Sequence, residues 1–280
     1  MDKITLADRY LKFSEGSKKL LPQKAVDLLI DAFNKVYADI CNFFNNGELL
    51  DVIITVKPEH GILPSQFVLL VTKTDYGVEV AKWEEQHIEF SSYERIFQKQ
   101  PDDIDFNDID FITHELVHVA QNSKYAYPIW INEGLADYGR AKFGLYDEKG
   151  GWYIPKATGD KNKKQYEFGY TIAAGFFIWI EENIDKTLPQ DLNYTIKAGK
   201  YNDSYFIEKT GKTVDELWEM YLDANILEHF AWIEEKFDIQ VPENLNNRIT
   251  SGTIDCNDEN YFIEKTGKTL DELFELFAGR

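Results

Sequence analysis

Cysteines, basic residues and long apolar runs are all scarce in this chain, and each scarcity narrows what the protein can be. Only Cys41 and Cys256 are present, far apart in the sequence, so no disulfide framework is indicated. Cys41 lies in an apolar helical pattern and is expected to be a buried thiol. Lys and Arg number 30 against 49 Asp and Glu, a net charge of −19. Because phosphate binding needs clustered Lys and Arg, we expect no nucleic-acid partner.

No apolar run approaches the roughly 18 residues that mark a membrane-spanning helix, so we expect no membrane span. The first residues, MDKITLADRYLKF, contain neither a long apolar core nor a cleavage site of small residues, unlike a secretory signal peptide. We therefore expect a cytoplasmic protein, unless a signal peptide has already been removed, in which case the protein is secreted.

The hydrophobic residues that are present suffice for a sizeable core, since they make up 44% of the 280 residues. This length fits one large domain with or without an appendage. The patterns divide the chain into an N-terminal helical segment (1–24), a main domain (25–225) and a C-terminal extension (226–280) that repeats the helical unit at 203–221.

The order of the predicted elements indicates the fold class. Residues 22–45 have the pattern of an amphipathic helix. Strands are expected at 49–58 and 67–73, with two more short strands within 78–92. Because the rest of the chain is mostly helical in pattern, the order predicts an α+β fold, with a small mixed or antiparallel sheet followed by a helical half. The segment 87–92 is expected to be an edge strand that lines a cleft and pairs with an extended peptide.

The most informative motif is HExxH, formed by His114, Glu115 and His118 in a helical pattern that Asn107 or Asp108 can cap. Histidines four residues apart on a helix point the same way, so both rings can bind one Zn²⁺ ion at about 2.0–2.1 Å. The glutamate between them lies beside that ion, where it can accept a proton from bound water. The motif predicts a zinc hydrolase site with Glu115 as the general base.

A third metal ligand is expected from a second helix, which is predicted to open at Pro128 and to stop at Gly144. Glu133 is the predicted ligand, with water in the fourth position. Asp137 lies four residues later on the same helix face, where it can accept the free N–H of a ligand histidine. The reverse assignment, with Asp137 as the ligand, is an alternative. The remaining histidines lack a partner at ligand spacing and are expected to be structural or exposed: His60, His87 and His229.

Several segments resemble the basic secretory protein family of plant and bacterial peptidases, within the gluzincin-like group of HExxH zinc peptidases. The matching segments are ITHELVHVAQ, which includes Gln121, together with PIWINEGLADYGRAKFG, FGYTIAAGFFIWIEENI and GKTVDELWEMY. The resemblance covers roughly residues 25–222 and implies a zincin-like fold. Plant members of the family are often basic and secreted, whereas this chain is acidic, so the resemblance leaves localisation and substrate preference open.

The resemblance also implies roles for single residues. The two motif histidines and Glu133 would bind zinc, and Glu115 would be the catalytic base. A tyrosine downstream of the motif would donate a hydrogen bond in the transition state, and the spacing of Tyr170 suits that role. Tyr138 is the alternative, and either tyrosine is otherwise explained by core packing.

An internal repeat occupies the C-terminal part: residues 205–213, YFIEKTGKT, recur unchanged as 261–269. In each copy a glycine is expected to end one helix and a threonine to cap the next, with a glutamate three residues later completing a capping box. These residues are Gly211, Thr213 and Glu216 in the first copy, and Gly267, Thr269 and Glu272 in the second. We expect a duplicated helical unit that packs against the main domain or trails behind it, or alternatively a second docking surface.

Together these features predict a zinc metallopeptidase that hydrolyses a peptide or protein substrate. The alternative is a non-catalytic metal-binding or protein-interaction domain that uses the acidic surface and the C-terminal repeat. Glu115 favours the enzyme, because metal binding alone does not need a base at that position.

Overall fold

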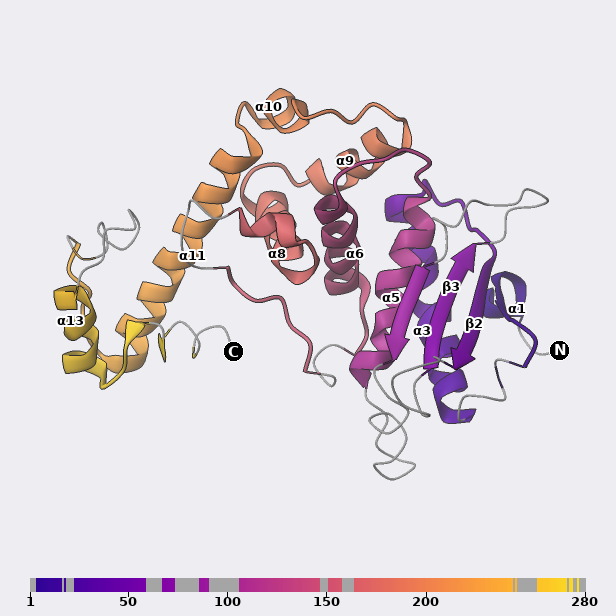
Figure 1. Cartoon of the computed structure of the whole chain (residues 1–280), viewed down its shortest axis with the longest axis horizontal. Coiled ribbons are helices and arrows are strands. Elements are labelled where there is room, and N and C mark those ends of the chain that lie inside the picture. Colours follow the sequence, from indigo (N-terminus) through magenta and orange to yellow (C-terminus); the bar gives the residue numbers. More distant parts are fainter. Residues whose placement is uncertain are drawn as a thin grey trace.

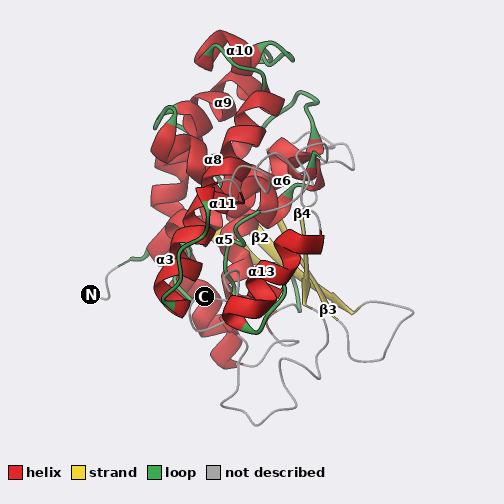
Figure 2. Cartoon of the chain, turned by 90° about the vertical axis from the view of Figure 1, so that its left-hand side faces the viewer, coloured by secondary structure: helices red, strands yellow, loops and turns green. Residues whose placement is uncertain are grey.

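The computed structural model is mostly helical in its described part, with one small sheet (Figure 1). The described residues are 4–16, 18, 23–58, 67–73, 86–90, 106–146, 151–157, 164–243, 245, 256–270, 272, 273 and 276. Figure 1 shows the sheet toward one end of the molecule, next to helices α3 and α5, and the long helix α11 leading to α13 at the other end. In Figure 2 the sheet again lies to one side of the helices.

The sheet is mixed and has the strand order β1-β2-β3-β4. The strands are β1 Leu11–Phe13, β2 Val52–Pro58, β3 Phe67–Lys73 and β4 Gln86–Phe90. β1 pairs with β2 in parallel, whereas the β2–β3 and β3–β4 pairs are antiparallel. The strands predicted at 49–58 and 67–73 are confirmed, and β4 is an edge strand of this sheet, as expected for 87–92. The further strand expected within 78–92 falls outside the described residues.

The N-terminal segment differs from its prediction, because residues 1–24 are not helical throughout. Helix α1 (Leu6–Tyr10) begins at a capping box formed by Thr5 and Asp8, and strand β1 follows it directly. β1 pairs with β2, which follows α3 in the sequence. Such a pairing depends on distant residues, so the local pattern could not reveal it.

The helical half follows the predicted order with small shifts at the helix ends. Its helices are α3 Gln23–Phe44, α5 Phe106–Gln121, α6 Ile129–Phe143, α8 Tyr170–Asn183, α9 Leu188–Lys197, α10 Tyr205–Thr210, α11 Val214–Phe237 and α13 Cys256–Thr266, with the 3-10 helix η1 at Gln165–Phe168. The helix predicted at 22–45 is confirmed as α3. The predicted cap of α5 is wrong: the helix begins at Phe106, so Asn107 and Asp108 lie in its first turn. Pro128 is the N-cap of α6 rather than its first residue, and Gly144 is the C-cap.

The main core lies between α3, α5, α6 and α8, and two glycines on α6 allow its neighbours to approach closely. A Cβ at Gly139 would lie 2.5 Å from a methyl group of Val117 on α5, and a Cβ at Gly134 would lie 2.5 Å from the Cβ of Ala173 on α8. No side chain fits at such distances. The small residues therefore determine how near α6 lies to α5 and α8. Cys41, on α3, is fully buried in this core, as expected.

A second, smaller core lies at the far end of α11. The first half of that helix contributes Leu217 and Trp218 to the main core, while its second half contributes Phe230 and Ile233 to the smaller one. Phe262 of α13 packs into the smaller core. One continuous helix thus supports two apolar clusters.

Both copies of the repeat have the predicted caps. Gly211 and Gly267 each adopt a φ of 74° after a helix end. The backbone N–H of Glu216 donates to the Thr213 hydroxyl, and that of Glu272 donates to the Thr269 hydroxyl. The same nine residues therefore form the same local structure twice, one copy packing on the main core and the other on the smaller core.

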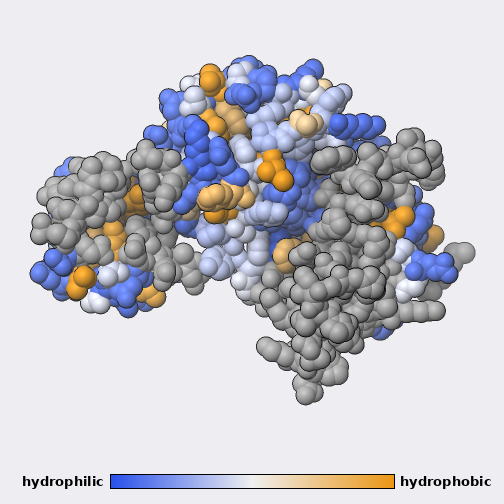
Figure 3. All heavy atoms as spheres, viewed as in Figure 1, coloured by the Kyte–Doolittle hydropathy of each residue, from blue (hydrophilic) through white to orange (hydrophobic). Residues whose placement is uncertain are grey.

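The described surface in Figure 3 is largely hydrophilic, with apolar side chains in small separate groups. None of the described helices combines the length and the apolarity needed to span a bilayer.

Candidate metal centre

The centre is built on the pair of helices α5 and α6, which run in opposite directions. Asp110, in the first turns of α5, accepts hydrogen bonds from the backbone N–H groups of Leu145 and Tyr146, which follow the end of α6. Asp110 also accepts from the hydroxyl of Thr113 at 2.9 Å. Because a buried carboxylate with several donors is held in one place, this cluster fixes the position of one helix along the other.

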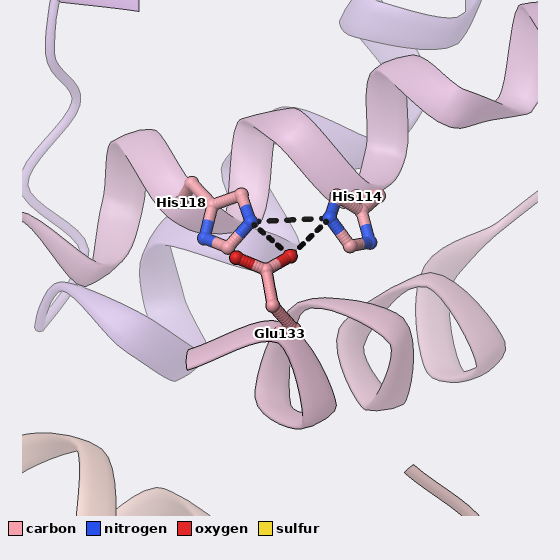
Figure 4. A group of neighbouring side chains, drawn as sticks. All are labelled: His114, His118 and Glu133. Carbon is pink, nitrogen blue, oxygen red and sulfur yellow. Dashed lines mark hydrogen bonds and ion pairs between the residues drawn. The ribbon is translucent and has the colours of Figure 1, made fainter. Parts of the chain in front are cut away.

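Three side chains from these helices converge on one point (Figure 4). The Nε2 atoms of His114 and His118 are 3.1 Å apart, and Glu133 Oε2 lies 3.4 Å from each of them. Two ligand atoms on a tetrahedral zinc ion, each about 2.1 Å from the metal, are about 3.4 Å apart. The three side chains thus already have nearly the spacing of a zinc ligand set.

Hydrogen bonds on the outer ring nitrogens determine which histidine atoms face the centre. His114 Nδ1 donates to Asp137 Oδ1 at 2.7 Å, and His118 Nδ1 donates to Gln121 Oε1 at 2.8 Å. In neutral imidazoles both Nε2 atoms then carry lone pairs directed at each other and at the carboxylate of Glu133. Three electron-pair donors that converge on one point fit a bound metal ion.

The electrostatics of the centre favour positive charge. Burial lowers the pKa of His114, but the hydrogen bonds of Asp137 and Glu133 and the charge of Glu115 outweigh it and raise that pKa to about 10. Burial raises the pKa of Glu133, yet its contacts with His114 and His118 leave the pKa well below the usual range for a carboxyl group. The site therefore stabilises a cation and keeps Glu133 ionised.

Glu115 and Tyr170 both lie beside the three converging side chains. Glu115 is 5% exposed, and its Oε1 is 4.0 Å from His114 Nε2. The ring of Tyr170 is nearly parallel to that of His114, with 6.3 Å between the ring centres, and it is 54% exposed. Burial and the charge of Glu133 raise the pKa of Tyr170, so its hydroxyl stays protonated and can donate. Tyr170 thus combines proximity to the centre with access to solvent.

Tyr138, the alternative to Tyr170, packs in the hydrophobic core. It is buried beside Phe43 of α3, and burial together with the charge of Glu181 raises its pKa. Asp137 likewise faces the outer nitrogen of His114, while the carboxylate of Glu133 faces both Nε2 atoms. This geometry favours Glu133 over Asp137 as the third ligand.

The sequence patterns did not identify the groups that hold Glu133 and Gln121. Asn132 Nδ2 donates to Glu133 Oε1 at 3.1 Å, and the hydroxyl of Tyr127 donates to Asn132 Oδ1 at 2.5 Å. Gln121 Nε2 donates to the backbone carbonyl of Asn132 at 3.4 Å. Of these residues, only Gln121 could have been linked to the centre from local spacing, because it lies three residues after His118 on the same helix.

The other histidines lie apart from this centre or outside the described side chains. His229 is buried on α11 beside the rings of Phe230 and Trp232, which fits the structural role expected for it. The side chains of His60 and His87 fall outside the described part of the chain.

Comparison with known proteins supports the family resemblance noted in the sequence. Residues 23–221 match the family described as peptidase of plants and bacteria. No curated protein and no solved structure matches the chain. The family match spans well over half of the 280 residues and includes every side chain of the centre described above. The chain therefore belongs to the basic secretory protein family, the peptidases of plants and bacteria.

Proposed function

We propose that this protein is a zinc metallopeptidase of zincin-like architecture, in which a small sheet precedes the HExxH helix. One observation carries the proposal: His114 Nε2, His118 Nε2 and Glu133 Oε2 lie 3.1–3.4 Å from one another, with Glu115 beside them. Membership in a peptidase family supports a peptide or protein as the substrate. The donor set, two imidazoles and one carboxylate, is that of catalytic zinc sites that keep a position open for water.

The chain's own residues would divide the reaction between them. A bound Zn²⁺ ion supplies a positive charge that lowers the pKa of a coordinated water toward about 7. Glu115 accepts a proton from the attacking water and delivers it to the amine of the leaving peptide. Tyr170 donates a hydrogen bond to the carbonyl oxygen as negative charge develops there. Asp137 and Gln121 hold the two imidazole rings in the tautomer that turns Nε2 toward the centre.

Replacing the base tests the proposal most directly. We expect Glu115→Gln to retain one zinc per chain and to lose hydrolysis by a factor of about 10²–10⁴. Metal analysis of the purified variant and digestion of a peptide library with and without chelator measure both. Full activity in this variant would dismiss Glu115 as the base. A wild-type chain that binds zinc but cleaves nothing would favour the non-catalytic alternative.

Replacing a ligand tests the metal set. We expect His118→Ala to lose both zinc and activity, because two remaining donors hold the ion poorly. Stoichiometric zinc in this variant would point to a different set of ligands.

A further inference from the structure

The two carboxylate oxygens of Glu133 have different surroundings. Oε2 lies 3.4 Å from Nε2 of both His114 and His118. Figure 4 shows this one oxygen joined to both histidines by dashed lines. Oε1 instead accepts a hydrogen bond from Nδ2 of Asn132 at 3.1 Å. One oxygen therefore faces the candidate metal centre, while the other is bonded to the protein.

The contact between Asn132 and Glu133 is not one that helical geometry supplies. The two residues are neighbours on α6, and adjacent side chains of a helix do not face each other. Tyr127, in the connection between α5 and α6, adds a second contact, because its hydroxyl donates to Asn132 Oδ1 at 2.5 Å. Burial and the charge of Glu133 raise the pKa of Tyr127, so its hydroxyl stays protonated and can donate. The amide of Asn132 is thus held from both of its ends.

The chemistry of the two partners determines which way the Asn132 amide faces. An ionised carboxylate can only accept hydrogen bonds, so the amide must present its NH₂ group to Glu133. The amide oxygen is then left to accept from the hydroxyl of Tyr127. A reversed amide would place two oxygens against each other. Only one orientation of the amide therefore satisfies both neighbours.

The stem of the Glu133 side chain is confined as well. Gly169, between η1 and α8, has a φ of 74° and lies close to this stem. A Cβ at Gly169 would lie 3.3 Å from the Cβ of Glu133 and 3.4 Å from the Cα of Trp130. Close packing at this distance leaves the stem little room to move. Packing of the stem and the hydrogen bond on Oε1 together restrict rotation of the carboxylate.

We propose that Asn132 and Tyr127 are positioning residues that present only Oε2 of Glu133 to a bound metal ion. A carboxylate can bind a metal ion through one oxygen or through both. In a catalytic zinc site the protein supplies three ligands, and water takes the fourth position. A second oxygen from Glu133 would occupy that position, so the hydrogen bond on Oε1 keeps it open for water. The inference rests on the metal centre of the proposed function.

Zinc affinity tests the positioning role, measured by chelator competition in the full-length protein. We expect Asn132→Ala to weaken zinc binding about 10- to 100-fold, because the carboxylate is no longer held. Tyr127→Phe keeps the ring and removes one hydrogen bond, so we expect a loss of about two- to tenfold. The matched controls are Tyr125→Phe, at an exposed position of the same connection, and Asn42→Ala, at an exposed position of α3. A variant that binds zinc as tightly as its control would overturn the role of that residue.

The double variant shows whether Tyr127 acts through Asn132. In the Asn132→Ala background we expect Tyr127→Phe to cause no further loss of zinc affinity, because the amide that the hydroxyl holds is absent. A loss as large as in the wild-type background would show that Tyr127 acts by another route and would overturn the proposed pair.

Visible absorption of the protein loaded with Co²⁺ in place of zinc tests the claim that one oxygen binds. Tetrahedral Co²⁺ absorbs visible light more strongly than Co²⁺ with five ligands. We expect the saturated Asn132→Ala protein to absorb more weakly than the wild type, because both oxygens of Glu133 can then reach the ion. A general loss of packing would lower the affinity and leave the spectrum of the saturated protein unchanged. An unchanged spectrum would therefore overturn the single-oxygen role.

Peptide hydrolysis separates this inference from the proposed peptidase function. Wild-type zinc affinity and Co²⁺ spectrum in both single variants, in a protein that cleaves peptides, would overturn the positioning role alone. The predicted changes in affinity and spectrum, in a protein that cleaves no peptide, would count against the peptidase function alone.

Discussion

Asp137 lies outside the proposed ligand set and contacts the candidate metal centre through His114. Its carboxylate accepts the Nδ1 proton of His114 at 2.7 Å and is buried. The negative charge strengthens His114 as an electron-pair donor. We expect Asp137→Asn, which keeps the shape and removes the charge, to weaken zinc binding about 10- to 100-fold in a chelator competition assay. Asp39→Asn, at an exposed position on α3, is the matched control. Equal zinc affinities in the two variants would contradict the role of Asp137.

The position of the Tyr170 side chain depends on an uncommon backbone conformation as well as on neighbouring side chains. Its φ is 48°, in the left-handed region that residues other than glycine rarely adopt. Such strain often marks a functional position. We expect Tyr170→Phe to bind zinc like the wild type, and its kcat to fall about 10²- to 10³-fold, because only the donated hydrogen bond is lost. Tyr153→Phe, at another exposed tyrosine, is the control. An unchanged kcat would mean that another group donates to the carbonyl oxygen.

The geometry of the centre was predictable where it depends on helical spacing. His114 and His118 are four residues apart on one helix, and Asp137 follows Glu133 by the same interval on the next, so each pair points in a common direction. The partners of Glu133 were not predictable in this way. The bond from Tyr127 to Asn132 depends on the path of the connection between α5 and α6, which helical periodicity does not describe.

At the level of whole elements, replacing Gly134 of α6 can measure how closely α6 must pack against α8. Replacing glycine by alanine within a helix gains about 1 kcal/mol of helix propensity. Here the new Cβ would lie 2.5 Å from the Cβ of Ala173 and 3.0 Å from the ring of Phe177. Such overpacking costs about 1–3 kcal/mol, and neither Cβ can turn away because each is fixed to its backbone. We expect Gly134→Ala to lower the free energy of unfolding by up to about 2 kcal/mol and to weaken zinc binding through the adjacent Glu133.

The matching change on α8 provides the control. Ala173→Gly removes the opposing Cβ, so Gly134→Ala should cost less in that background. Urea denaturation of the two single variants and the double variant measures this coupling, which we expect to be about 0.5–3 kcal/mol. A Gly134→Ala protein more stable than the wild type would show that helix propensity outweighs packing here.

Elements with a strong local pattern were predicted better than elements with a distant partner. The apolar spacing of α3 and the caps of the repeat depend on residues that are close in the sequence. Both predictions were confirmed. β1 contains only Leu11–Phe13, and it is extended because it pairs with the distant strand β2. A three-residue strand has too short a pattern to be distinguished from the end of a helix.

For the whole molecule, the repeat provides an internal comparison of the two cores. Phe206 and Phe262 occupy the same position in identical sequences and are 2% and 0% exposed. Phe206 packs in the main core, with its ring stacked on that of Trp130 at the start of α6. Phe262 packs in the smaller core, with its ring stacked on that of Phe230 of α11. The same substitution therefore tests each core separately.

We expect Phe206→Ala and Phe262→Ala each to cost about 3–5 kcal/mol in the core that holds the side chain. Hydrogen exchange measured by mass spectrometry should show lost protection in α6 and weaker zinc binding only for Phe206→Ala. For Phe262→Ala, the loss should be confined to α13 and the second half of α11, because the apolar contacts of Phe262 lie there. Equal loss of protection in α5 and α6 for both variants would show that the two cores unfold together. In that case the C-terminal residues would stabilise the metal centre as well as their own core.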